Sequence, residues 1–537
     1  IKEIEFHGNG KEKAERVFAD RHDQVWITTS GKGVTRYDVT TGQSRYYHLS
    51  PRHIEAVLDF ERPVFYEDFN DELWVGLCGG GLLRYNRAED RFESWLNDLK
   101  DSKSIPSNVV LCMTEDNMGN LWIGTGPYMG GLVKAIRANK AFIGVKPKAD
   151  AVTFGENTVR SLTTDRFGHL WVGTRGGAIR AYDSNGNILV EMAAIRLTDG
   201  TKRRATAYSL MVSHDDRLWV ATKGDGVFVS EKKIGKDVKD MRFVAISQAA
   251  RWERRTPEVD LAYSLAEDGN GNIWVATYGG GIVRISIEGS GNITARVFTH
   301  QNSGLADNKA RHVVRSASGD ILIGSLGGAN VIRAAETRKA TPSITPLWMG
   351  ADVCHISETR DGDICLSSIG QGLIVLSVNG QDTTHHILMR QDGLCGNSVY
   401  GTAMDHNADL WVITEDGINK IDRRLKTIES FNLADGLPFA NFSESAITPQ
   451  KDGAVIVGGR DGYMLIHPQE ISQTRRDGTT MLTDLWVNGT HAIPAQGNIL
   501  KQDIAYTRHI TLRYDQNNVM ARFATMDLSD PTRASFS

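Results

Sequence analysis

One short phrase dominates this chain: an aliphatic residue and tryptophan, then an aliphatic residue, a small residue and threonine. Its best-preserved copies are Leu121–Thr125, Leu170–Thr174 and Ile273–Thr277. The tryptophan position of the ten copies holds Trp26, Trp74, Trp122, Trp171, Trp219, Trp274, Leu322, Cys365, Trp411 and Ile456, so neighbouring copies lie 43 to 55 residues apart. A repeat of this length is typical of a propeller or a solenoid.

Each repeat predicts four short antiparallel strands. In the best-preserved unit, strands are expected over 262–266, 273–277 and 282–286, and a fourth over 295–299. The segments between the first three are rich in Asp, Asn and Gly, which tolerate the positive φ of tight hairpin turns. Four antiparallel strands in each repeat form a propeller blade, so we expect an all-β chain built of tandem β-propellers.

The repeated tryptophan has two interpretations. It lies in the middle of the second strand, where one face of the sheet packs on the next blade, and its neighbours in the strand are equally apolar. We therefore expect it to pack between blades, where a buried indole contributes roughly 150–250 Å² of contact. A row of sugar-stacking tryptophans is the alternative.

The spacing of the repeats divides the chain into three parts. The seven repeats from Trp171 to Ile456 predict a seven-bladed propeller over residues 151–470, and the three earlier repeats predict the last blades of a first propeller within residues 1–150. Folded proteins avoid unpaired sheet edges, so we expect the chain to be part of a longer protein. A single ten-bladed ring is the alternative.

The repeat stops after Ile456. Residues 471–537 contain alternating segments at 482–489, 509–514 and 519–524. They predict the first strands of an Ig-like β-sandwich that is incomplete in this sequence.

Composition and cysteine spacing exclude several classes of function. A net charge of −4 over 537 residues argues against a broad nucleic-acid-binding surface. The five cysteines lack zinc-site spacing, and we expect no metal and no cofactor; Cys354 and Cys365 flank a turn and are the one pair that could face each other. Asp268–Asn272 resembles the start of a calcium loop, but its sixth and twelfth positions are Ile273 and Gly279, so a plain hairpin is favoured.

No apolar run reaches the 18 residues that a membrane-spanning helix needs, and nothing resembles a signal peptide. The first residue is Ile1, so we expect any signal to lie outside this segment.

These repeats resemble the two-component regulator propeller repeat. The family pattern begins with Asn-x-Val, continues with an Asp-x-x-Gly-Asn turn and the tryptophan strand, and ends with a triple-glycine turn and Arg-Tyr-Asp. Residues 107–109, 116–120 and 121–125 match its first three features, and residues 79–81 and 84–86 match the last two. The segment 510–527 resembles the start of the Tyr-rich sandwich domain that ends such ectodomains. The resemblance covers nearly the whole chain.

The resemblance implies the periplasmic sensor region of a membrane-spanning regulator, often a hybrid histidine kinase that controls glycan utilisation. Kinase, receiver and DNA-binding parts would lie outside this segment, membrane attachment would follow its C-terminal end, and the regulator would be a homodimer. Some relatives carry a diguanylate cyclase instead.

Blade geometry predicts where a ligand would bind. The residues that begin the first strand of a blade and those in the turn after its second strand meet on one face, around the central opening. The candidate ligand-contacting residues are Asn157, Arg160, Arg175, Lys223, Asp225, Tyr278, Lys309, Arg311, Asn397, Glu415 and Arg460. Several are basic, and arginine binds carboxylate and sulfate with forked hydrogen bonds, so an acidic oligosaccharide is the expected ligand. For each residue alone, a solvated loop charge is the competing interpretation.

No catalytic residue is predicted, because a catalytic site needs paired groups of defined role and the scattered histidines show none. Two other functional classes remain open at this point. One is a propeller enzyme, a lyase or a glycan-cleaving enzyme, and the other is a passive protein-binding scaffold.

Overall fold

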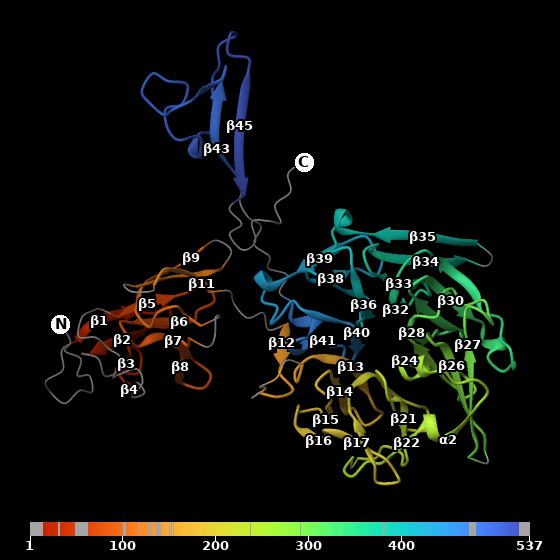
Figure 1. Ribbon diagram of the computed structural model, residues 1–537. Coiled ribbons are helices and arrows are strands. Elements are labelled where there is room, and N and C mark those ends of the chain that lie inside the picture. Colours follow the sequence, from red (N-terminus) through yellow and green to blue (C-terminus); the bar gives the residue numbers. More distant parts are fainter. Residues whose placement is uncertain are drawn as a thin grey trace. The chain divides into compact units, whose positions relative to one another are not determined.

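The structure is a computed structural model (Figure 1). It describes residues 14–29, 33–48, 63–99, 104–116, 119–126, 130–135, 141–149, 151, 153, 155–236, 238–289, 291–379, 382–471 and 480–525. These residues are almost entirely strands and turns, as the repeats predict. The chain forms two compact units, one of Ile1–Arg137 with Gln473–Ser537 and one of Ala138–Ser472.

The unit Ala138–Ser472 is a β-propeller whose seven main sheets are here called blades 1 to 7. A further two-stranded sheet of β17 (Ala194–Arg196) and β18 (Lys202–Arg204) lies between blades 1 and 2 in the sequence. Blade 1 consists of β13 (Val159–Thr164), β14 (Leu170–Thr174), β15 (Ile179–Tyr182) and β16 (Ile188–Met192). Blade 2 consists of β19 (Ala207–Val212), β20 (Leu218–Thr222), β21 (Gly226–Ser230) and β22 (Phe243–Ala245). Blade 3 contains β24 (Ala262–Glu267), β25 (Ile273–Thr277), β26 (Gly281–Ile287) and β27 (Ile293–Phe298). Blade 3 has a fifth strand, β23 (Ala250–Trp252), parallel to β27 and preceded by the short helix α2 (Ile246–Ala249).

The strands of blades 4 to 7 are β28 (Ala310–Arg315), β29 (Ile321–Ser325), β30 (Gly328–Ile332), β31 (Thr345–Met349); β32 (Val353–Glu358), β33 (Ile364–Ser368), β34 (Leu373–Asn379), β35 (Asp382–Leu388); β36 (Val399–Met404), β37 (Leu410–Thr414), β38 (Ile418–Ile421), β39 (Ile428–Phe431); and β40 (Phe442–Pro449), β41 (Val455–Gly459), β42 (Gly462–Ile466) with β12 (Phe142–Val145). The first strand of each blade is the innermost one. Each innermost strand contacts that of the next blade, and β40 contacts β13, which closes the ring.

Strand β12 corrects the sequence-based boundary between the first two parts. That boundary assigned residues up to 150 to a first propeller, yet β12 pairs antiparallel with β42, with Phe142 opposite Ile466 and Val145 opposite Tyr463. Blade 7 is therefore built from both ends of the unit, and backbone hydrogen bonds join them. The boundary was placed too late because β12 belongs to no copy of the tryptophan phrase.

The N-terminal part contains three further blade-like sheets. Their strands are β1 (Ala14–Ala19), β2 (Gln24–Thr29), β3 (Gly33–Asp38), β4 (Ser44–His48); β5 (Val64–Glu67), β6 (Leu73–Leu77), β7 (Gly81–Asn86), β8 (Arg91–Trp95); and β9 (Val110–Glu115), β10 (Leu121–Thr125), β11 (Leu132–Ala135).

The C-terminal part forms a three-stranded sheet of β43 (Thr480–Val487), β44 (Thr490–His491) and β45 (Val519–Thr525), in the order β44-β43-β45. The strand expected over 509–514 is not formed. Ile510 and Leu512 of this segment pack instead against the small core around Leu485 and Val487.

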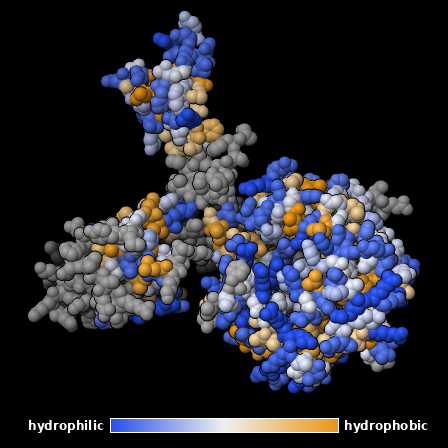
Figure 2. Space-filling model, viewed as in Figure 1, coloured by the Kyte–Doolittle hydropathy of each residue, from blue (hydrophilic) through white to orange (hydrophobic). Residues whose placement is uncertain are grey.

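The tryptophans pack between blades, as their apolar neighbours predict. Trp171, Trp219, Trp274 and Trp411 are 0 or 1% exposed. Trp171 of blade 1, for example, shares its core cluster with Ala207 of blade 2. A sugar-stacking row of tryptophans is therefore excluded in these blades. The outer surface of the ring that Figure 2 shows is mainly hydrophilic, with scattered apolar residues.

An aspartate in the hairpin turn holds the buried tryptophan in place. Asp268 accepts hydrogen bonds through Oδ1 from the backbone N–H groups of Asn270 and Asn272, and through Oδ2 from the indole N–H of Trp274 at 2.9 Å. The same aspartate-to-indole bond joins Asp20 to Trp26, Asp68 to Trp74, Asp116 to Trp122, Asp165 to Trp171 and Asp405 to Trp411. Both oxygens of Asp268 thus serve a hairpin, which confirms that interpretation over a calcium loop.

Candidate functional site

The innermost strands carry a recurring β-bulge at their second residue. In β13 the register passes from Val159 opposite Thr174 to Ser161 opposite Gly173, which leaves Arg160 without a partner in the sheet. Blades 1 to 6 present Arg160, Tyr208, Tyr263, Arg311, Cys354 and Tyr400 at this position. Bulges re-aim side chains and are frequent next to functional sites. Because the innermost strands surround the ring axis, these residues gather around it at one end of the ring.

Six residues at this end form a continuous series of contacts, which we call the channel-mouth cluster. Its members are Arg160, Tyr208, Lys223, Tyr263, Tyr278 and Lys309.

Three tyrosines form the centre of the cluster. The ring centroids of Tyr208 and Tyr263 lie 5.0 Å apart, and those of Tyr263 and Tyr278 lie 5.2 Å apart in a stacked arrangement. Backbone bridges join Tyr278 to Lys309 and Lys223 to Leu261, so the loops that carry these side chains are held to the start of the next blade. The cluster is therefore positioned by the sheets and not by long loops.

Three cations lie against the tyrosines. The guanidinium of Arg160 lies 5.2 Å and the ammonium of Lys223 lies 5.6 Å from the ring centre of Tyr208. The ammonium of Lys309 lies 5.6 Å from the ring centre of Tyr278. Such contacts hold a cation near a ring face without neutralising its charge.

The cluster is electrostatically positive. Among the described residues, no carboxylate forms an ion pair with its three cations, and the Nε atom of Arg160 is buried without a hydrogen-bond partner. Burial raises the pKa of Tyr263, while the ammonium of Lys223 opposes that rise. The buried Nε of Arg160 is an unused donor, and a buried unused donor favours an added acceptor.

The blades that follow the channel-mouth cluster carry carboxylates at the same end. Arg311 of blade 4 donates through one nitrogen to both carboxylate oxygens of Asp352 at 2.7 Å, and through the other to Glu444 of blade 7. Burial lowers the pKa of Arg311, but the negative charges of Glu444 and Asp352 raise it by more. The pKa of Arg311 therefore lies above its usual range. The carboxylates of Glu415 and Glu444 add to the burial that raises the pKa of Tyr400. Carboxylates thus gather around Arg311 and Tyr400.

The structure brings part of the predicted set together. Arg160, Lys223, Tyr278 and Lys309 belong to the channel-mouth cluster, and Arg311 lies beside it within its own ion pairs. The backbone of Arg175 and of Arg460 contacts Thr158 at the start of β13, and both side chains are exposed.

Other predicted residues have structural roles. Asn157 binds the backbone of Lys148 through its amide, and Asn397 accepts from the backbone N–H of Arg390. Glu415 accepts from the backbone N–H groups of Asn397 and Ser398. Asp225 is half-buried. Burial raises the pKa of the neighbouring Asp260, and the negative charge of Asp225 also raises it.

Sequence reasoning missed Tyr208 and Tyr263. Both occupy the second residue of an innermost strand, the position of Arg160 and Arg311, so an alignment of the repeats on this position would have found them. Sequence reasoning also missed Asp352, which directly precedes β32 as Lys309 precedes β28, and Glu444, which lies where the register of β40 is irregular.

Two histidines join blades near the axis. The imidazole Nδ1 of His312 in blade 4 accepts from the backbone N–H of Ile356 in blade 5, and that of His355 accepts from Thr402 in blade 6. Their ring centroids lie 4.4 Å apart. Burial lowers the pKa of His355 to about 4 and holds that of His312 well below its usual value. Both rings are therefore neutral structural acceptors.

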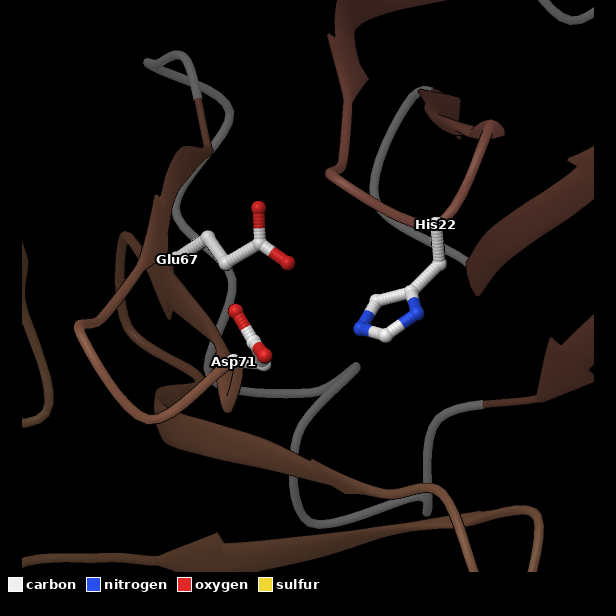
Figure 3. A group of neighbouring side chains, drawn as sticks. All are labelled: His22, Glu67 and Asp71. Carbon is white, nitrogen blue, oxygen red and sulfur yellow. The ribbon is translucent and has the colours of Figure 1, made fainter.

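One group in the N-terminal part has the composition of a metal site. His22, Glu67 and Asp71 offer ligand atoms within 4.8 Å of one another (Figure 3). Arg21 donates to Asp71 at 2.9 Å, and Arg87 lies 3.3 Å from Glu67, so both carboxylates already have cationic partners. These partners disfavour an added metal ion.

The position of Glu67 also recurs in other blades. Its carboxylate accepts from the backbone N–H of Arg21 in the turn of the preceding sheet. The same bond is made by Glu115 with Phe69, Glu267 with His214 and Glu358 with Ala317. Glu67 thus belongs to a connection between neighbouring sheets that recurs in several repeats. This structural role explains why its carboxylate lies close to His22 and Asp71.

Cys354 and Cys365 do not form a disulfide with each other, and both are free thiols, as is Cys112. Cys354 and Cys365 are buried, but the register places Ser357, not Cys354, opposite Cys365.

The closed ring and its repeated blades define a β-propeller protein. Three segments, 104–126, 153–176 and 259–279, match the family described as two component regulator propeller. Each contains the first two strands of a sheet, the second of which is the tryptophan strand, and the hairpin turn between them. The protein therefore carries two component regulator propeller repeats.

Known proteins agree with this assignment. A curated relative, "Histidine kinase P4" of Formosa agariphila, is 24% identical over 364 residues, which are 65% of this chain and 25% of the relative. This chain thus spans about a quarter of the length of that relative.

Two solved structures share the fold. They are extracellular domains of proposed hybrid two component systems of B. thetaiotaomicron. The domain of BT3049 is 18% identical with a TM-score of 0.56, covering 96% of this chain and 76% of its own. The domain of BT4673 is 20% identical with a TM-score of 0.50, covering 97% and 67%. In the described part of this chain, no helix is long and apolar enough to cross a membrane.

Proposed function

We propose that this chain is the ligand-sensing region of a membrane-spanning signal-transduction regulator of the hybrid histidine kinase kind. The regulator propeller repeats, the curated histidine kinase relative and the fold of extracellular two component domains support this proposal. The sensing region would lie in the periplasm, with the kinase on the other side of the inner membrane. A diguanylate cyclase output is the less favoured alternative, because the curated relative is a histidine kinase.

The ligand we propose is an acidic oligosaccharide bound at the channel-mouth cluster. The observation that carries this proposal is the series of three contacting tyrosines flanked by Arg160, Lys223 and Lys309. None of these cations forms an ion pair with a described carboxylate. Tyrosine rings offer apolar faces to the C–H groups of a sugar. A hydrogen bond between a cation and a carboxylate or sulfate contributes about 1.5–3 kcal/mol.

Binding would act on signalling by a shift of conformational equilibrium. A ligand shifts such an equilibrium only by its difference in affinity for the two states. We propose that the regulator is a homodimer with two arrangements and that the C-terminal sandwich passes the change toward the membrane.

The test is a calorimetric comparison of variants with tetragalacturonate as the probe. Arg160→Met keeps the apolar stem but removes the guanidinium, and we expect at least tenfold weaker binding. Arg423→Met removes an exposed arginine that pairs with Asp361, and it should bind as the wild type does. Equal affinity of all three proteins would refute the assignment of the site. A binding role also predicts that the tetrasaccharide is recovered intact, whereas cleavage would support the propeller-enzyme alternative.

A further inference from the structure

The innermost strand of blade 7 departs from the other six. In β40 the register passes from Phe442 opposite Gly459 to Ile447 opposite Val457. Residues 443–446 therefore lie opposite the single residue Gly458 and form an irregular bulge. Within it Ser445 has a φ of 58°, in the left-handed region that non-glycine residues adopt only at a cost in free energy. A strained conformation of this kind persists only where neighbouring contacts hold it.

Two contacts hold the bulge, and both cross the ring axis. Glu444 pairs with Arg311 of blade 4, and the hydroxyl of Ser445 donates to the carbonyl oxygen of Cys354 in blade 5 at 2.7 Å. Blade 7 is therefore bound to blades 4 and 5, neither of which is its neighbour in the ring. We call these two contacts the cross-ring bridge.

The two carboxylates on Arg311 differ in how replaceable they are. Asp352 binds one guanidinium nitrogen with both oxygens, and its side chain is 24% exposed. Glu444 binds the other nitrogen with one oxygen, and its side chain is 37% exposed. Arg311 itself is only 12% exposed, so its charge needs a partner. A carboxylate or sulfate arriving from solvent can take the place of Glu444 more easily than that of Asp352.

Arg311 also lies next to the channel-mouth cluster. It occupies the bulge position of blade 4, directly after Tyr263 of blade 3, and Lys309 precedes it by two residues on the same loop and strand. An extended ligand held by Arg160 and the tyrosines therefore continues toward Arg311.

We propose that Arg311 is a second anion subsite of the channel mouth, and that Glu444 occupies this subsite until an acidic group of the ligand displaces it. This inference rests on the proposed binding of an acidic oligosaccharide and adds that at least two of its sugars carry acidic groups. Displacement breaks the Glu444–Arg311 contact of the cross-ring bridge, which leaves the Ser445 hydrogen bond alone to hold the strained bulge of β40. Binding at the mouth is thus coupled to the packing of blade 7.

The first experiment does not depend on the oligosaccharide. Inorganic sulfate is titrated against the whole chain at constant ionic strength, and thermal unfolding is followed. Glu444→Gln keeps the shape of the side chain but removes the competing charge, and we expect its apparent dissociation constant for sulfate to fall at least fivefold below that of the wild type. Adding Arg311→Gln to this variant should abolish the gain.

The control variant is Asp361→Asn, which removes the carboxylate of an exposed arginine pair away from the axis. It should respond to sulfate as the wild type does. An equal response of Glu444→Gln and Asp361→Asn would overturn the proposal.

The second experiment uses the wild type, so it remains decisive if Glu444→Gln fails to fold. Amide hydrogen exchange at residues 443–446 is measured with and without saturating sulfate or tetragalacturonate. Faster exchange with either probe is expected. Binding of tetragalacturonate without a change at 443–446 would overturn the displacement and leave the proposed function standing. A response to sulfate without any binding of tetragalacturonate would uphold the subsite and refute the proposed ligand.

Discussion

The indole N–H of Trp171 donates to Oδ2 of Asp165 at 3.0 Å, and Oδ1 of the same aspartate accepts from two backbone N–H groups of the hairpin turn. One carboxylate thus fixes both the turn and the side chain that packs on the next blade. This bond recurs through the repeats, which explains why an aspartate and a tryptophan six residues apart accompany each other along the chain.

Removing this carboxylate should destabilise the propeller. Asp268→Ala leaves the buried indole N–H of Trp274 and two turn N–H groups without acceptors, so we expect a loss of about 2 to 3 kcal/mol in the free energy of unfolding. Urea denaturation measures this loss. Glu288→Ala, at an exposed turn of the same blade, should change the value by less than about 0.5 kcal/mol.

The buried tryptophans should be needed for stability and not for ligand binding. Trp411→Leu removes a fully buried indole between blades, and we expect a loss of about 3 kcal/mol. Calorimetry with tetragalacturonate on the folded variant should give an unchanged affinity. A variant that keeps its stability but loses binding would show that the indole serves the ligand.

The pairing of β12 predicts where the ring begins. A chain that starts at residue 139 contains every strand of blade 7, whereas one that starts at residue 151 lacks β12 and leaves β42 unpaired. We expect cooperative thermal unfolding of the first chain and a clearly lower unfolding temperature, or aggregation, of the second. Equal unfolding temperatures would show that the closure by β12 contributes nothing.

The buried histidines predict a loss of stability in mild acid. The unfolded chain protonates His355 near its ordinary pKa of 6.5, whereas the folded chain does so only near about 4. Between these values the unfolded state binds more protons, so the free energy of unfolding falls as the pH falls, by up to about 3 kcal/mol from this residue. His355→Gln, which keeps an acceptor but does not titrate, should lessen the slope between pH 6.5 and 4.

A second histidine supplies a control of opposite sign. A hydrogen bond and the charge of Glu267 raise the pKa of the exposed His214, so the folded state binds its proton more tightly than the unfolded state does. Its contribution to stability is present at low pH and disappears as the pH rises through its folded pKa. His214→Gln should therefore steepen the acid-induced loss of stability, and a shallower slope than that of the wild type would contradict this sign.

The fold was predictable because each repeat encodes its blade locally. Turn residues, alternating strands and the tryptophan position recur within every unit, so the blade order and the packing of the indoles could be predicted from the sequence. Strand β12 could not, because its partner β42 lies more than 300 residues later and no repeated phrase marks it.

The candidate site was predictable only in part. Repeat geometry predicted that Arg160, Lys223, Tyr278 and Lys309 meet at one end of the blades, and the structure brings these four residues together. It did not reveal that Asn157 and other polar residues bind backbone groups, because such bonds depend on loop conformation. The pairing of Glu444 with Arg311 depends on a bulge that breaks the repeat pattern, and the two residues lie far apart in the sequence.

We propose that the positive, tyrosine-lined channel mouth recognises an acidic oligosaccharide. The most direct test of this proposal is a calorimetric titration of the whole chain with tetragalacturonate and with the neutral galactotetraose, which differs in lacking the carboxylates. We expect the acidic tetrasaccharide to bind at least tenfold more tightly, with a preference that weakens as salt is added. Equal binding of the two sugars, or tighter binding of the neutral one, would show that the channel mouth does not recognise acidic groups.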